Sequence, residues 1–213
     1  MKKINFSVNK STLLSGYLAN FNPEIFEDIL EIAYESVIAG NEKVSNIVKS
    51  EPTLFSKNTL KSLLLNNAMI DIFKTRILTN EKTKHRVKFF ETFRMTFALV
   101  DNKFFLCFKA LGKENVIEGM KTKRFEDIIK GKPFSMSQKM SKEISKLNLT
   151  DLPPILFVGF KKTTDFIDFI NLQYYFDEKI ALEVTMRNAA TSNKLDIIKP
   201  KNLNNDDDAS LAI

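Results

Sequence analysis

The chain has one cysteine and one histidine in 213 residues, and it has no tryptophan. A single cysteine, Cys107, excludes an internal disulfide framework and any metal site built from several thiolates. A single histidine, His85, excludes the histidine pairs of most catalytic zinc sites. Cys107 lies within an apolar run, where a thiol behaves as a small hydrophobic group. The sequence therefore predicts a buried structural role for Cys107 and an exposed linker position for His85, and it indicates no metal and no cofactor.

Glycine is also scarce, and no two of the six glycines lie closer than seven residues apart. This spacing excludes the glycine-rich loops that bind mononucleotides and dinucleotides, and no serine has the Gly-x-Ser-x-Gly context of a hydrolase nucleophile. The longest apolar runs, residues 104–108 and 155–158, are far shorter than the roughly 20 residues that a membrane helix needs. The start of the chain lacks the apolar segment of a secretory signal. We expect a cytoplasmic protein without a membrane partner.

Apolar residues make up 44% of the chain and charged residues 27%, which is typical of a folded globular protein. The first eighty residues are predicted to be helical. Asn22 is a suitable N-terminal cap for a first helix, which Gly40 is expected to end. A short helix over residues 42–49 and a longer one after Ser56 follow. These last two could form a helix-turn-helix, but the intervening turn is long and the second helix is apolar, which favours simple helical packing.

From about Arg86 the hydrophobic period changes from 3.6 residues to 2, which indicates strands. Two hairpins are predicted, with turns at Asp101-Asn102 and Asp177-Glu178, and a buried strand over residues 155–160 lies between them. Short helices are expected over residues 124–130 and 138–147. The prediction is an α+β protein: a helical region over residues 1–80, an antiparallel sheet domain with short helices over residues 81–190, and a disordered acidic tail over residues 191–213.

Positive charge is concentrated in the middle of the chain. Residues 81–146 contain 16 basic and 8 acidic residues, an excess that can attract nucleic acid or an acidic protein. Lys82, Lys84, Arg86 and Lys88 recur at every second residue, so we expect them along one side of a strand. A solvated lysine-rich surface is the alternative, because few of these bases are arginine. The candidate nucleic-acid-binding residues are this group and a second one, Lys121, Lys123, Arg124, Lys130 and Lys132.

The same segment does not fit the strand pattern of a metal-dependent nuclease. Such a site requires an acid two residues before a lysine on a strand, and Cys107 occupies that position before Lys109. The densest acidic cluster, Asp206 to Asp208, falls in the predicted tail. A nuclease would instead need distant carboxylates to converge in space; the candidates are Glu91, Asp101, Asp168 and Glu183. The sequence by itself assigns no catalytic residue.

Several short motifs between residues 86 and 187 resemble a family of uncharacterised bacterial and phage proteins. They are a strand that ends with Phe108-Lys109, a polar segment with Thr122 ahead of Arg124-Phe125, and Leu152-Pro153-Pro154 before a strand containing Val158-Gly159-Phe160. Members of that family are found in mobile-element neighbourhoods, near regulators and toxin–antitoxin-like genes. The resemblance implies a role in conflict between phage and host, and it carries over no catalytic residues.

Together these features predict a non-enzymatic binding protein of phage defence, counter-defence or toxin–antitoxin type. Its basic surface would engage nucleic acid, either DNA or RNA, or an acidic protein partner. Two alternatives remain open. A metal-dependent nuclease or RNA-targeting toxin would place carboxylates beside the basic surface. A structural interaction subunit would have scattered lysines and a large exposed apolar patch.

Overall fold

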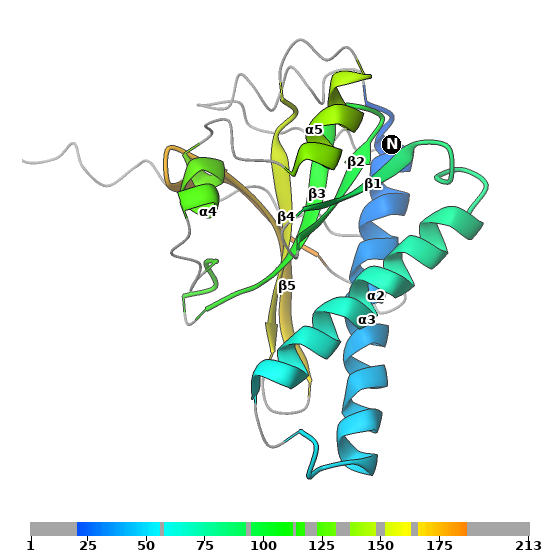
Figure 1. The fold of residues 1–213 in the computed structure, drawn as a ribbon, viewed down its shortest axis with the longest axis vertical. Coiled ribbons are helices and arrows are strands. Elements are labelled where there is room, and N and C mark those ends of the chain that lie inside the picture. Colours follow the sequence, from blue (N-terminus) through cyan, green and yellow to red (C-terminus); the bar gives the residue numbers. More distant parts are fainter. Residues whose placement is uncertain are drawn as a thin grey trace, which may run out of the picture.

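The computed structural model describes residues 21–55, 58–92, 95–112, 114–117, 123–130, 137–147, 152–162 and 166–186. Its centre is a six-stranded sheet with helices on both faces (Figure 1). The helices are α2 (Pro23–Ser50), α3 (Asn58–Thr79), α4 (Lys123–Ile129) and α5 (Gln138–Ser145). The strands are β1 (Val87–Thr92), β2 (Met95–Val100), β3 (Phe104–Ala110), β4 (Ile155–Lys162), β5 (Ile167–Phe176) and β6 (Lys179–Thr185). The predicted α+β class is confirmed.

The strands lie in the sheet in the same order as in the sequence. All neighbours are antiparallel except β3 and β4, which run parallel. A parallel pair needs a long crossover connection, and the segment that carries α4 and α5 provides it. The sheet therefore consists of two three-stranded antiparallel units that meet along β3 and β4.

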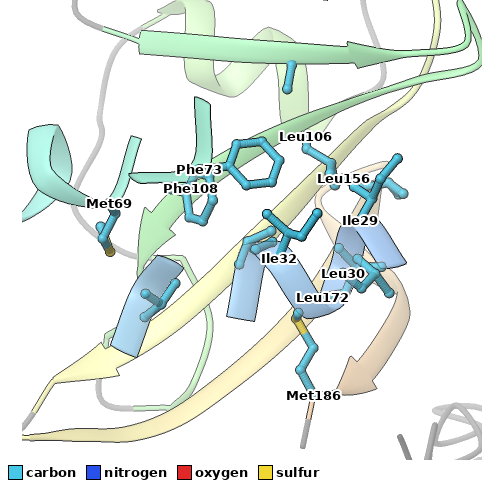
Figure 2. Close-up of a cluster of buried hydrophobic side chains, with 14 of the residues drawn as sticks. Ile29, Leu30, Ile32, Met69, Phe73, Leu106, Phe108, Leu156, Leu172 and Met186 are labelled. Atoms are coloured by element: carbon cyan, nitrogen blue, oxygen red, sulfur yellow. The ribbon is translucent and has the colours of Figure 1, made fainter. Parts of the chain in front are cut away.

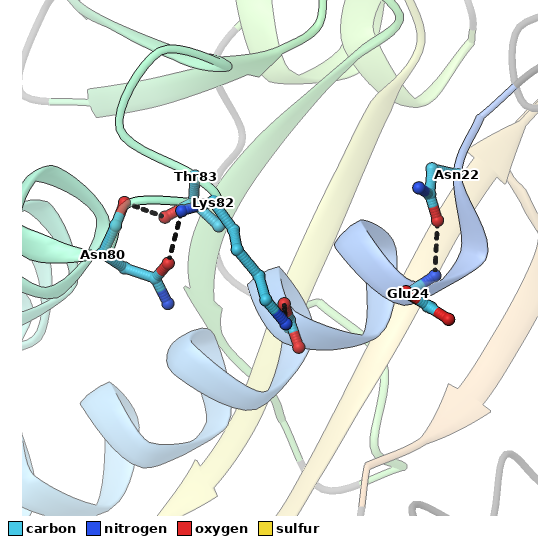
Figure 3. Close-up of polar contacts among 6 residues, drawn as sticks. Asn22, Glu24, Asn80, Lys82 and Thr83 are labelled. Carbon is cyan, nitrogen blue, oxygen red and sulfur yellow. Dashed lines mark hydrogen bonds and ion pairs between the residues drawn. The ribbon is translucent and has the colours of Figure 1, made fainter.

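α2 begins as predicted but extends further. The Asn22 side chain accepts a hydrogen bond of 2.9 Å from the backbone N–H of Glu24, and Pro23 occupies the first helical position (Figure 3). The prediction that Gly40 ends the helix is wrong, because α2 continues to Ser50 and includes residues 42–49. A side chain at Gly40 would lie 2.7 Å from Met69 Cγ and 3.0 Å from Met69 N. Gly40 thus allows α2 and α3 to approach closely, and no helix-turn-helix is formed.

The first face of the sheet packs against α2 and α3. Figure 2 shows Ile29, Leu30 and Ile32 of α2 beside strand residues, and Met69 and Phe73 of α3 in the same cluster. The strands contribute Leu106, Phe108, Leu156 and Leu172, among others, and Met186 directly after β6 joins them. The helical region and the sheet therefore share one hydrophobic cluster, and its burial is the main stabilising contribution to this side of the molecule.

The second face packs against α4 and α5, which lie on the opposite side of the sheet from α2 and α3 in Figure 1. Phe125 and Ile128 of α4 and Met140 of α5 are buried there. The strand residues of this cluster are Phe90, Met95, Phe97, Leu99, Phe105, Cys107, Ile155, Phe157 and Tyr175. Because helices cover both faces, β3 is apolar at consecutive positions rather than alternating.

Both predicted hairpin turns are confirmed. Asp101 and Asn102 have φ values of 45° and 58°, and Asp177 and Glu178 have 50° and 64°. Two consecutive residues with positive φ form the turn that suits the twist of a two-residue hairpin. The sequence prediction omitted β1. Its adjacent residues Phe89 and Phe90 pack on opposite faces of the sheet, so no alternation of apolar and polar residues was visible.

Some predictions fall outside the described residues. They include the cap at Ser56 and the acidic tail over residues 191–213, which contains Asp206 to Asp208. The short helices of the crossover are confirmed with slightly different ends, as is the strand predicted over residues 155–160. Neither α2 nor any other helix in the described ranges is long and apolar enough to cross a membrane.

Candidate functional site

The prediction that the first basic group lies along one side of a strand is wrong. Lys82, Lys84 and Arg86 belong to a turn over residues 81–86 that precedes β1, and Lys88 alone is a strand residue. Asn80 and Thr83 hold this turn. The Asn80 side chain accepts a hydrogen bond from Lys82 N at 2.9 Å (Figure 3). The buried Thr83 hydroxyl donates to Ile77 O at 3.0 Å. These side-chain bonds satisfy the end of α3 and compete with an extended conformation.

The three turn cations are each paired with an acid. Lys82 Nζ lies 3.2 Å from Asp28 Oδ2 on α2. The Lys84–Glu81 pair has a separation of 2.6 Å, and Arg86 Nη1 lies 2.7 Å from Asp101 Oδ2. A cation beside an acid contributes little field at a distance, because the two charges cancel. In the part of the chain that the structure describes, Lys88 is exposed and forms no ion pair.

The described members of the second basic group belong to the opposite face of the sheet, with α4. Lys123 is exposed on α4, and Arg124 is part of the same helix. Lys130 follows α4 and lies 2.8 Å from Glu178, whose hydrogen bond and charge raise the pKa of this lysine. Lys121 and Lys132 are outside the described residues. The structure therefore separates the two groups, since Lys82 lies beside α2 and the second group accompanies α4.

Two lysines that the sequence analysis missed extend the second group. Met140 of α5 is 1% exposed, so Lys139 and Lys142 on the same helix point away from the core and are exposed. Neither forms an ion pair within the described ranges, whereas Lys146 pairs with Glu143 at 2.8 Å. We call Lys123, Lys130, Lys139, Lys142 and Lys146 the α4–α5 basic surface. Lys130 and Lys146 are each paired with an acid, and the same two helices carry Glu126, Asp127 and Glu143, so most of its field would come from Lys123, Lys139 and Lys142. α2, on the other side of the sheet, contains six acidic and two basic residues.

A polar cluster occupies the rest of the second face. The register aligns Lys109 of β3 with Gly159 of β4, Gly159 with Asn171 of β5, and Gln173 of β5 with Glu183 of β6. Asn171 and Gln173 are fully buried. We call Lys109, Asn115, Lys161, Asn171, Gln173, Tyr175 and Glu183 the polar cluster. The signal in the sequence was the alternation of Asn171, Gln173 and Tyr175 with the apolar residues of β5.

Hydrogen bonds join the polar cluster to the loop over residues 111–117. Gln173 Nε2 donates to Asn115 O at 2.7 Å, and the backbone N–H of Ile117 donates to Tyr175 Oη at 3.0 Å. Lys161 Nζ donates to Asn115 Oδ1 at 3.1 Å. Tyr175 Oη in turn donates to Gln173 Oε1 at 2.9 Å, and burial raises the pKa of this phenol. Gln173, Tyr175 and Lys161 thus form the half of the cluster that holds the loop on the sheet.

The other half of the polar cluster centres on Glu183. Its Oε1 accepts hydrogen bonds from Asn171 Nδ2 and, at 3.0 Å, from Gln173 Nε2. Glu183 is half-buried, and none of the described lysines or arginines forms an ion pair with it. Asn171 Oδ1 is buried without a hydrogen-bond partner. Lys109 is half-buried with its Nζ 5.8 Å from the centre of the Phe125 ring, and burial lowers its pKa.

The described residues supply no metal centre. They contain no group of three or more histidine, cysteine, aspartate or glutamate side chains placed to hold an ion. Glu91 is paired with Lys74 at 2.6 Å and Asp101 with Arg86, so these carboxylates are held at separate places. Burial raises the pKa of Cys107 to about 11, which keeps its thiol protonated at neutral pH.

No protein-family model, no curated protein and no solved structure matches this chain.

Proposed function

We propose that the protein is a non-enzymatic binding protein that engages nucleic acid through the α4–α5 basic surface. The observation that carries this proposal is the exposure of Lys123, Lys139 and Lys142, which form no direct ion pair in the described ranges, although the carboxylates of Glu91 and Glu143 lie near enough to Lys139, and that of Glu143 to Lys142, to feel their charge. Uncompensated cations attract phosphates, and each neutralised phosphate releases a counterion. The turn cations Lys82 and Lys84 are matched by acids and contribute less.

Nucleic acid is a better partner for this surface than an acidic protein. Protein interfaces bury a core of large apolar side chains, inside a polar rim. Among the described residues, the large apolar side chains that are exposed are Leu54, Leu60, Leu63, Leu78, Phe166 and Phe176, and none of them belongs to α4 or α5. Lysines act as point charges on phosphates and do not read the bases. Binding that is sensitive to salt and indifferent to sequence is therefore proposed.

The biological setting proposed is phage defence, counter-defence or a toxin–antitoxin system. Its support is the resemblance of the segment between residues 86 and 187 to proteins of mobile elements. In such a setting, the protein would act by occluding a nucleic acid.

The test is a binding titration of the full chain with labelled oligonucleotides at several salt concentrations. Replacing Lys139 and Lys142 by glutamine should weaken binding and reduce the slope of log affinity against log salt by about one or two units. The matched control replaces Lys82 and Lys84, two lysines that are already paired, and should change affinity less. Equal effects of the two double variants, or no binding by the native chain, would overturn the proposal.

A further inference from the structure

The outward face of α2 carries all six acidic residues of that helix. Their spacing places them within about 100° of one another around the helix axis, on the side opposite the buried residues. We call them the acidic stripe: Glu24, Glu27, Asp28, Glu31, Glu35 and Glu42. Asp28 pairs with Lys82 and Glu35 with Arg76, whereas the other four form no ion pair within the described ranges. Like charges at this spacing destabilise a helix, so a cationic partner that covers the stripe relieves their repulsion.

α5 carries a basic stripe on its own outward face. It consists of Lys139, Lys142 and Lys146, which lie within about 60° of one another around the helix, and all three are exposed. Met140, by contrast, is buried in the core. Lys146 is the C-terminal cap and keeps a helical backbone, so it continues the stripe. Its ion pair with Glu143 is exposed and contributes little, so Lys146 can exchange this partner for another.

The two stripes match in spacing. Lys139, Lys142 and Lys146 are separated by three and then four residues, and so are Glu24, Glu27 and Glu31. Each set of three therefore spans about 10 Å along its helix. An α5 laid beside an α2 in the same direction would place each lysine next to one glutamate. Complementary charges of this kind determine which surfaces meet, and in which register, more than they add affinity.

The stripes of one chain cannot meet each other, because α2 and α5 lie on opposite sides of the sheet (Figure 1). We propose that the acidic stripe of one copy of the chain binds the basic stripe of a second copy. The contact uses a different surface on each copy, so every copy that joins leaves one free stripe of each sign, and the copies form an open row. A contact between two charged helix faces lacks the apolar core of a stable interface, so the association is weak.

This inference goes beyond the proposed function and does not require that nucleic acid binds. It adds a competition, because the phosphates of a nucleic acid and the acidic stripe of a second copy would both use Lys139 and Lys142. Nucleic acid that binds would therefore separate the copies.

The first test is sedimentation velocity of the full native chain, free of nucleic acid, at several protein concentrations. At about 0.05 M salt the chain should sediment faster as its concentration rises. At about 1 M salt, where charges are screened beyond about 3 Å, it should remain a monomer. A native chain that is monomeric at both salt concentrations would overturn the inference, and so would association that is unchanged by salt. This arm does not depend on the folding of a variant.

The second test exchanges the charges of the two stripes. One variant carries Glu24→Lys, Glu27→Lys and Glu31→Lys, which makes both of its stripes basic. The other carries Lys139→Glu, Lys142→Glu and Lys146→Glu, which makes both acidic. Each variant alone should remain a monomer at low salt, whereas an equal mixture should associate, because every contact again joins opposite charges. A mixture that remains monomeric, or single variants that associate as the native chain does, would overturn the inference.

The control for net charge carries Glu51→Lys, Asp71→Lys and Glu81→Lys. It makes the same change of charge as the first variant at exposed positions outside the stripes. It should associate more strongly than that variant. Equal loss of association in the two would mean that net charge alone decides, and the inference would fail.

The last arm separates this inference from the proposed function. A short labelled oligonucleotide added to the associated native chain at low salt should bind and separate the copies. An oligonucleotide that binds and leaves the association unchanged would overturn the inference, because both partners need the same lysines. An oligonucleotide that does not bind would overturn the proposed function and leave the association of copies standing.

Discussion

The two faces of the sheet differ in what covers them. Two helices of 28 and 22 residues cover the first face, and helices of seven and eight residues cover the second. The first face forms one extended apolar cluster, whereas the second is apolar at one end and polar at the other. Buried polar groups cost free energy unless they are hydrogen-bonded, so they stabilise less than apolar packing does. The first face therefore combines long helices with continuous apolar packing, whereas the second combines apolar packing with a hydrogen-bonded polar cluster.

The two faces should differ most in the free energy of unfolding that is lost when one buried phenylalanine of each face is replaced by alanine. Phe73 of α3 is 1% exposed and makes edge-to-face contacts with Phe89 and Phe108. Phe73→Ala should cost about 3–5 kcal/mol of unfolding free energy, since long helices cannot collapse into the cavity. Phe125→Ala on α4 should cost less, because this helix has only seven residues and can shift.

Urea denaturation of the two variants measures both losses. A greater loss for Phe125→Ala than for Phe73→Ala would show that the second face contributes more to stability, and it would break the comparison.

A smaller loss of stability is expected from a substitution at Gly40, where α2 and α3 approach closely. Glycine to alanine within a helix usually stabilises by up to about 1 kcal/mol. Gly40→Ala should instead destabilise by about 1–3 kcal/mol, because the added methyl group meets the side chain and backbone of Met69. Thermal unfolding followed by circular dichroism measures the change. A melting temperature above that of the native chain would mean that the helices can separate slightly, so the first face would be less tightly packed than described.

The smallest effect concerns the hydroxyl that fastens the loop over residues 111–117. Tyr175→Phe removes the acceptor of Ile117 N–H and the donor to Gln173 Oε1, which should cost about 1–2 kcal/mol. Tyr34→Phe is the control, because the half-buried Tyr34 lies on the first face and no hydrogen bond of its hydroxyl is among those that the described residues form. Amide hydrogen exchange at Ile117 should quicken in the first variant only. Unchanged exchange would mean that the polar cluster does not hold the loop.

Much of the fold could be predicted from the sequence, because hydrophobic periodicity and turn residues act locally. Asn22 caps α2, and Asp101-Asn102 and Asp177-Glu178 form the two turns where they were expected. The end of α2 could not be predicted in this way. Gly40 resembles a helix end, and its role depends on Met69 of another helix, which is remote in the sequence.

The candidate site was less predictable than the fold. The spacing of Lys82, Lys84, Arg86 and Lys88 suggested a strand, but the Asn80 and Thr83 side chains hold a turn instead. Which lysines meet an acid depends on contacts such as Lys82 with Asp28, 54 residues apart. The polar cluster comes from four strands and a loop, so only the register of the sheet brings it together.

The parallel pairing of β3 with β4 affects how the chain can fold. Within each three-stranded unit, neighbouring strands are consecutive in the sequence. The contacts of each unit therefore form between residues that are close in the sequence. The seam between the units aligns Phe105 with Ile155, and the chain must first bring these distant residues together. The polar cluster combines Lys109 on one side of the seam with Asn171, Gln173 and Glu183 on the other. The cluster would therefore be complete only in the last stage of assembly, when the two halves of the sheet have joined.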